Sequence, residues 1–201
     1  MYKRLKPFYR IILASAFLSL ALVSCDKDDL PHNSPAYYIA ESEKLVIPAS
    51  VALPEDPHSH NKRVATYFAV GVQKYKAQLK AGTSTYEWVL VGPQADLYDN
   101  RNAKVGTHGV GPHWQLSPKD SIFAQQFAPP RTAPSPEPNA VDWLLLMPKV
   151  GTTPTGIFKH VVYIQRIATK GGKAPATLPT SATETVEVQY TAIYRFTKNK
   201  P

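Results

Sequence analysis

Apolar and polar residues alternate most clearly in VEVQYTAIYRF, residues 186–196. One face of this run would carry its apolar residues: Val186, Val188, Tyr190, Ala192, Tyr194 and Phe196. The other face would carry Glu187, Gln189, Thr191 and Arg195, with Ile193 as the exception. This period of two predicts a half-buried β-strand.

Several other runs have the composition of strands. FKHVVYIQRIAT, residues 158–169, is β-branched and mostly apolar, as expected of a more central strand. RVATYFAVGVQKYKAQL, residues 63–79, is too long for one strand, so Gly71 is expected to mark a bulge or bend within it. TYEWVLV, SIFAQQFA and DWLLLMP are predicted to supply further strands.

Turn signals separate these runs. They are Ala81-Gly82, Gly92-Pro93, Asp99-Asn100 and Gly171-Gly172. PPRTAPSPEP, residues 129–138, contains five prolines and is predicted to be a long extended loop. No segment beyond Leu45 has a convincing helical pattern. We therefore predict an all-β fold, a single β-sandwich or barrel-like domain with long Pro/Gly-rich loops.

The N-terminal segment has a different pattern. Basic residues in MYKRLKPFYR precede the apolar run IILASAFLSLALVS, which is typical of a secretory signal peptide and short for a transmembrane helix. LVSC, residues 22–25, resembles the lipobox of bacterial lipoproteins, in which the signal is cut before a cysteine that is then acylated. We predict a signal peptide over 1–24, a lipidated tether over 25–44 and a β-rich domain over 45–201, with Cys25 as the lipidation site.

The expected location is the cell envelope. The acyl chains on Cys25 would anchor the protein in a membrane, and we predict the outer membrane. DKDD, residues 26–29, resembles the surface-export signal of some Gram-negative lipoproteins, and the alternative is a solvated spacer. The polar segment that follows contains Pro31 and Pro35, as a tether would.

Charge and cysteine content narrow the function classes. The formal net charge of +8 owes much to four basic residues in the predicted signal peptide, and +4 would remain after cleavage. No dense Lys/Arg run accompanies that charge, so no nucleic-acid partner is expected. Cys25 is the only cysteine, so the domain depends on its core and has no disulfide.

A set of short motifs spans most of the chain. They are GVQKY (71–75), W-x-x-x-x-P-x-A-x-L-x-D (88–99), HGVGPHW (108–114), DS (120–121), WLLL (143–146), YIQRIATKGGKAP (163–175) and YTAIYRF (190–196). Their spacing resembles the secreted bacterial and fungal family known as domain of unknown function thirty-four fifty-five. The resemblance implies secretion and a β-rich domain but no established activity. The usual family motif carries two cysteines in the neighbourhoods where this chain has Lys76-Ala77 and Leu178-Pro179. The disulfide that other members could form there is therefore missing from this chain.

VGTHGVGPHW, residues 105–114, is the first candidate for a site. His108 and His113 would lie on opposite faces of a strand, although a turn at 109–112 would fold them back together. His58 and His60 are further candidate ligands, but zinc or copper needs three or four converging groups. His113 also stands where a small polar residue is common in the family. The sequence favours a histidine hydrogen-bonded in a glycine-rich turn, and we predict no metal site.

Aromatic and polar residues suggest a cleft. Trp114 and Trp143 are expected in the core. The alternative is an exposed aromatic surface that stacks on sugar rings, formed by Tyr37, Tyr38, Tyr98 and Trp114. Gln73, Gln165, Arg166 and Gln189 lie inside strand-like runs. They are expected either on a solvated face or in a cleft with His108, Gln165 and Arg166 at its floor. An arginine there would favour an acidic or hydroxylated ligand.

No catalytic motif is present. The chain lacks G-x-S-x-G, and it lacks a G-x-G-x-x-G in a βαβ setting, so no cofactor is expected. A carboxylate pair for glycoside hydrolysis would have to come from Asp96, Asp99, Asp120 and Asp142. We therefore expect a lipid-anchored binding or structural module, for a glycan or another envelope component. The alternative is a metal-dependent or carboxylate-based hydrolase.

Overall fold

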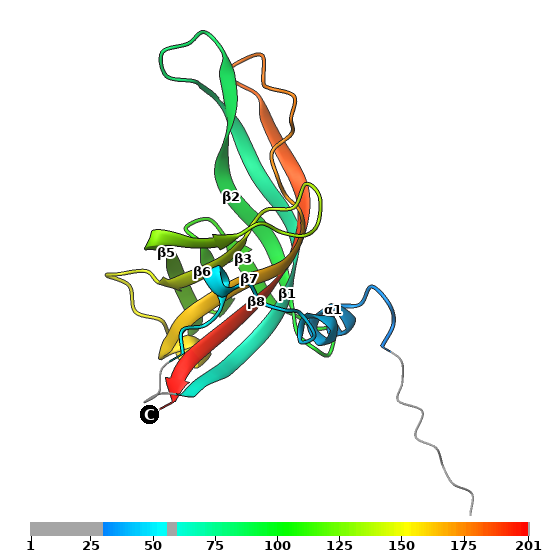
Figure 1. Cartoon of the computed structure of the whole chain (residues 1–201), viewed down its shortest axis with the longest axis vertical. Coiled ribbons are helices and arrows are strands. Elements are labelled where there is room, and N and C mark those ends of the chain that lie inside the picture. The colour runs from blue at the N-terminus through cyan, green and yellow to red at the C-terminus, as the bar shows by residue number, and fades with distance from the viewer. Residues whose placement is uncertain (1–29, 56–59, 201) are drawn as a thin grey trace, which may run out of the picture.

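The computed structural model describes residues 30–55 and 60–200. Eight antiparallel strands close into one barrel, with neighbours in the order β1 to β8 (Figure 1). The elements are α1 (Pro35–Ser42), η1 (Ala49–Val51), β1 (His60–Leu79), β2 (Tyr86–Tyr98), β3 (Lys104–Gly109), β4 (His113–Ser117), β5 (Asp120–Ala133), β6 (Trp143–Pro148), η2 (Gly156–Phe158), β7 (Val161–Gly171) and β8 (Thr185–Lys200). The prediction of an all-β domain is confirmed, in its barrel form. Among the described residues, no helix has the length and apolar character needed to cross a bilayer.

Strand β1 is longer than the sequence analysis allowed. It continues without interruption from His60 to Leu79, and its register shifts lie between Arg63 and Ala65 and between Lys74 and Tyr75. The prediction of a bulge or bend at Gly71 was wrong. Gly71 instead permits a close approach between strands, because a Cβ atom there would collide with the carbonyl oxygen of Gln94.

Two proline-containing segments also lie within strands. Gly92-Pro93, predicted as a turn, continues β2 opposite Lys74 and Gln73. Val91 has no partner in this register and is the extra residue of a β-bulge. Strand β5 continues through Pro129 and Pro130 to Ala133, with a register shift after Gln126, so the predicted loop begins five residues later than its prolines suggested.

The barrel buries apolar side chains on both faces of some strands. Its interior holds the inward row of β8, Tyr190, Ala192, Tyr194 and Phe196, packed with Trp114 and other residues. A second cluster lies outside the wall and contains Phe68, Trp143, Leu145, Ile167 and Ile193. Ile193 broke the alternation in the sequence because it points outward and is nevertheless covered.

The N-terminal segment supplies that cover. Ile39 of α1 and Val51 of η1 pack into the outer cluster, and Figure 1 shows α1 beside the barrel wall. Residues 35–42 were assigned to the tether, and the structure instead places them in a packed helix. Pro35 stands at the first position of the helix, where proline is favoured, and the Ser34 hydroxyl accepts a hydrogen bond from the Tyr37 N–H at 3.1 Å.

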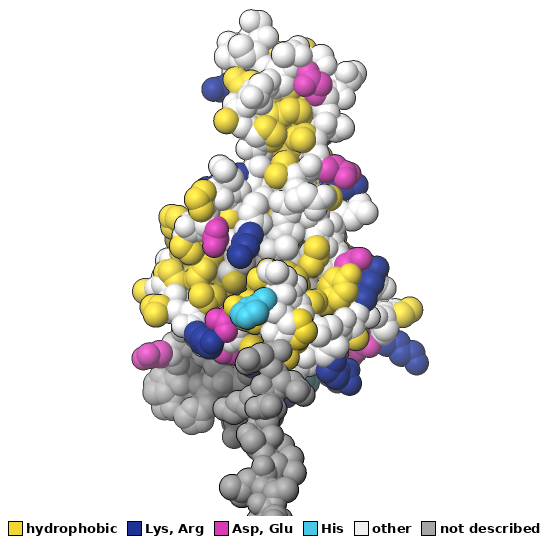
Figure 2. Space-filling model, turned by 90° about the vertical axis from the view of Figure 1, so that its right-hand side faces the viewer, with side chains coloured by type: hydrophobic (Ala, Val, Ile, Leu, Met, Phe, Trp, Pro, Cys, Tyr) yellow, Lys and Arg dark blue, Asp and Glu magenta, His cyan; other side chains and the backbone are white. Residues whose placement is uncertain are grey.

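An arm extends from one end of the barrel. It consists of the β1–β2 hairpin and the adjacent first half of β8, which pairs with β1 as far as Lys76 and Thr185 (Figure 1). The loop after β7 lies against this arm, where the Trp88 Nε1–H donates to the Thr177 carbonyl at 2.9 Å. Figure 2 shows the arm as a narrow column above the broader body, with hydrophobic side chains on the visible face.

Candidate functional site

The 105–114 stretch forms the β3–β4 hairpin. His108 pairs with Trp114 and Gly109 with His113, and the connecting turn contains Gly111 at a φ of 120°. The His108 side chain points into the barrel, whereas the His113 ring stacks on Phe123 at a centroid distance of 4.2 Å. The two imidazoles therefore do not converge, as strand alternation predicts.

His108 is held in one tautomer. Its Nδ1 lies 2.9 Å from the His113 carbonyl oxygen, which can only accept, so Nδ1 carries the proton. Nε2 then accepts a hydrogen bond from the Tyr194 hydroxyl at 3.0 Å, and the Tyr190 hydroxyl lies 3.4 Å from the Tyr194 hydroxyl. Burial lowers the pKa of His108 to about 3, so the ring is uncharged at neutral pH.

Trp114 completes this aromatic centre. Its indole stacks on His108 at 4.4 Å and 8°, and it meets Tyr194 and Phe196 edge to face. The side chain is fully buried, which confirms the expectation of a core tryptophan. Its Nε1–H has no hydrogen-bond partner among the described residues.

A cavity of about 240 Å³ lies next to this centre, and we call it the lumen cavity. Every strand of the barrel contributes to its lining: Gln73, Leu90, Val91, Gly92, Pro93, His108, Trp114, Gln126, Leu146, Arg166 and Tyr194, with Gly111 and Pro112 from the β3–β4 turn. The cavity brings together three of the four predicted cleft residues, His108, Trp114 and Arg166.

Gln165 does not join them. It lies on the outward face of β7, where its Nε2 donates to the Val51 carbonyl at 2.8 Å. Neighbouring residues of a strand point to opposite faces, so Gln165 and Arg166 cannot share one cleft. The prediction that Gln165 lies in the cleft was wrong. The Gln165 side chain instead joins η1 to the outside of the barrel wall.

Gln73 also lines the lumen cavity, although the sequence did not place it at the floor of the cleft. It continues the inward row of β1, two residues before Tyr75, and its side chain is only 1% exposed. Neither its Oε1 nor its Nε2 has a partner among the described residues. Buried amides are normally paired with protein groups or with ordered water, so this amide marks a place in the cavity wall where a water or a polar ligand group would bind. The available signal was a glutamine at an inward position of an apolar strand.

Arg166 supplies the charge of the cavity. Its Nε and Nη2 donate to the Asp142 carbonyl at 3.1 and 2.8 Å, which satisfies hydrogen bonds but leaves the charge uncompensated. No ion pair joins Arg166 to a carboxylate within the described residues. Among the described residues that line the cavity there is no Asp or Glu, so this lining is electropositive and rich in hydrogen-bond donors.

Three of the four candidate aspartates have other side-chain contacts. Asp99 accepts from the Arg101 and Ala103 N–H groups; burial opposes its ionisation, but these bonds and the Arg101 side chain outweigh it and lower its pKa. Asp120 accepts from Ser117 and from the Ile157 N–H, which lowers its pKa. Asp96 pairs with Lys104 at 2.8 Å. Within the described residues, no group of three or more His, Cys, Asp or Glu side chains is placed to hold a metal ion.

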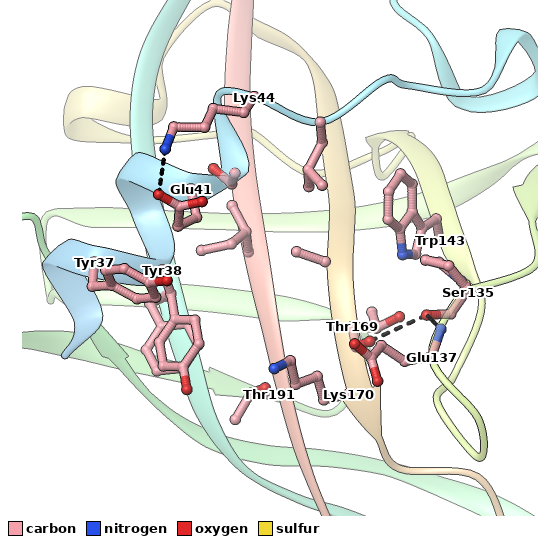
Figure 3. A pocket seen from close by; sticks show the side chains of 16 residues that line it. Tyr37, Tyr38, Glu41, Lys44, Ser135, Glu137, Trp143, Thr169, Lys170 and Thr191 are labelled. Atoms are coloured by element: carbon pink, nitrogen blue, oxygen red, sulfur yellow. Dashed lines mark hydrogen bonds and ion pairs between the residues drawn. The ribbon is translucent and has the colours of Figure 1, made fainter. Parts of the chain in front are cut away.

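A second hollow, the outer groove, lies between α1 and the barrel wall (Figure 3). It measures about 340 Å³ and includes Tyr37, Tyr38, Glu137, Trp143 and Lys170. The Trp143 Nε1 is buried without a partner among the described residues. Figure 3 shows Tyr37 and Tyr38 on the helix side of this groove.

The predicted aromatic surface does not form as one unit. Trp114 lies inside the barrel, Tyr37 and Tyr38 lie outside it, and Tyr98 ends β2 opposite Phe68. The rings are separated because α1 packs on the outer wall, which the tether assignment did not anticipate. Cys25 and His58 lie outside the described residues.

The family model for the "protein of unknown function (DUF3455)" matches residues 57–198. The chain belongs to the DUF3455 family. The match covers the barrel from β1 to residue 198 of β8 and includes His108, Trp114 and Arg166, so the resemblance drawn from the motifs is confirmed. No curated protein and no solved structure matches the chain.

Proposed function

We propose that this DUF3455 protein is a lipid-anchored binding module of the cell envelope that holds a small ligand in its lumen cavity. The anchor rests on the lipobox-like LVSC at residues 22–25. The binding role rests on one observation, the Gln73 amide, which is buried against the cavity and whose two polar atoms pair with no other described residue. An occupant that donates and accepts hydrogen bonds would satisfy it.

The shape of the cavity agrees with this role. The interior of a closed eight-stranded barrel is either filled by side chains or holds one small ligand, and here a cavity remains. The cavity combines apolar walls, including Leu90 and Leu146, with a few polar groups that converge from different strands. Such a combination is typical of binding sites for small molecules.

A glycan remains a second candidate ligand, and the outer groove is where it would fit. The groove offers the unpaired Trp143 Nε1–H together with Glu137 and Lys170, a mixture of donors and acceptors suited to hydroxyl groups. A ligand screen therefore has to report on both sites.

The test is a screen of neutral, acidic and saccharide compounds by protein-observed NMR. Ligands of the lumen cavity should shift the Trp114 indole N–H and the Gln73 amide signals, and ligands of the outer groove should shift the Trp143 indole. Leu90→Trp would fill the mouth of the lumen cavity from a half-exposed position and abolish binding there.

Leu79→Trp is the matched control. Leu79 is 52% exposed, as Leu90 is, but it lies on the arm outside the cavity lining. Its replacement should leave binding unchanged. If no compound shifts Trp114 or Gln73, and native mass spectrometry finds no bound molecule, the binding role is refuted.

A further inference from the structure

The lumen cavity has two chemically different ends. Gln73 and Trp114 line it with buried polar groups, and Arg166, which is partly buried, adds its charge. Leu90 and Val91 line the same cavity but are 52% and 43% exposed, so they mark its opening. The cavity therefore passes from a donor-rich interior to an apolar rim.

The β-bulge in β2 builds this rim. Val91 is the extra residue between the pairs Tyr75–Leu90 and Lys74–Gly92, so two consecutive apolar side chains both reach the cavity. Val110 of the β3–β4 turn is also exposed and lies against Gly92, where an added Cβ would be 2.9 Å from its Cγ2. Leu90 and Val91 form the apolar rim, and Val110 lies beside it.

The inner end selects for negative charge. Arg166 keeps N–H donors beyond the two that Asp142 uses, because a guanidinium has five. The Gln73 Nε2 and Trp114 Nε1 are further donors without partners in the described chain. His108 is uncharged at neutral pH, and the described part of the lining includes no acidic residue. A cationic ligand would meet an uncompensated like charge, whereas an anion would compensate it.

We propose that the ligand is an amphipathic anion, with a carboxylate-type head held by Arg166, Gln73 and Trp114 and an apolar body lying across the rim. This inference rests on the proposed binding function. Arginine matches the planar, two-oxygen geometry of a carboxylate. A cavity of about 240 Å³ is many times the space that one water needs, so the head and a short part of the body fit inside.

The test compares four probes by isothermal titration calorimetry on the purified full chain: octanoate, octanol, octylamine and acetate. Octanoate should bind at least about tenfold more tightly than octanol or acetate, and octylamine should not bind. This comparison uses the unmodified protein, so it does not depend on how a variant folds.

Variants then assign each contribution. Arg166→Gln should weaken octanoate binding about tenfold or more while leaving octanol binding unchanged; Lys119→Gln, which removes a charge from the exposed β4–β5 turn, is its control. Leu90→Ser should weaken octanoate but not acetate, with Leu79→Ser as control. Circular dichroism establishes that each variant is folded.

The outcomes separate the two proposals. Octanol binding as tightly as octanoate, or an Arg166→Gln protein that retains full octanoate affinity, would overturn the inference and leave the binding function standing. Absence of any probe binding would also overturn it. The binding function itself fails only if the wider screen finds no ligand at Trp114 or Gln73.

Discussion

His108 shows how one buried side chain couples the hairpin to the barrel core. It joins the His113 carbonyl to the Tyr194 hydroxyl while its ring stacks on Trp114. Because only the neutral ring can accept from Tyr194, protonation would break this chain as well as bury a charge.

The pKa of His108 predicts a pH-dependent stability. The pKa of His108 is about 3 in the folded protein and 6.5 in the unfolded chain. At a pH between these two values, unfolding is therefore accompanied by uptake of a proton. The free energy of unfolding should fall as the pH drops from about 6.5 towards 3, and it should not depend on His108 above about 6.5. Urea denaturation should show the wild type losing about 2 kcal/mol more than His108→Gln between about pH 6.5 and 5.

His113→Gln is the control for this experiment. The His113 ring is partly exposed on the outer face of the hairpin, so its removal should leave most of the pH dependence intact. Parallel pH profiles for the wild type and His108→Gln would contradict the assignment of a neutral, buried ring.

Helix α1 matters at the scale of elements because it covers an outward apolar face. Ile39 packs into the outer cluster with Phe68, and the Arg195 Nη2 donates to the Ser42 carbonyl at 2.7 Å. Ile39→Ala should lower the free energy of unfolding by about 2 kcal/mol through lost packing. Val46→Ala, at a residue that is 90% exposed, should change it by less than about 0.5 kcal/mol. Equal effects in urea denaturation would show that α1 does not stabilise the barrel.

Strand identity followed from local pattern, but strand faces and ends did not. The period of two in β8 located that strand because its inward row is continuous. The same pattern did not reveal that Ile193 is covered, since the cover comes from residues 35–53. Proline and glycine were taken as terminators, yet Pro93, Pro129 and Pro130 lie in strands, at or near register shifts that relax the ladder.

The candidate site could be predicted in part for a similar reason. His108 and Trp114 lie in one short hairpin, so their proximity is local and visible in the sequence. Gln73 and Arg166 reach the same cavity only through the register of β1, β7 and β8. Long-range register depends on barrel closure, which no single run of residues encodes.

At the scale of the whole molecule, the predicted lipid anchor is open to a direct test. Cys25→Ala should move the protein from the membrane fraction to the soluble fraction, because the acylated thiol is lost. Ser24→Ala, which keeps a small residue before the cysteine, should remain in the membrane fraction. Cell fractionation with immunoblotting measures both, and tight membrane association of Cys25→Ala would refute the lipoprotein prediction.

The pairing of β1 with β8 has a consequence for the order of folding. These strands bring residues 60–76 against residues 185–200, so the ring closes only when the end of the described chain is available. Until then β1 and β7 each present an unpaired edge, which is a template for association with other chains. Closure of so long a loop is also entropically slow. A nascent chain that stops short of Thr185 therefore has no complete barrel to form, and the final strand acts as the step that commits the molecule to its native state.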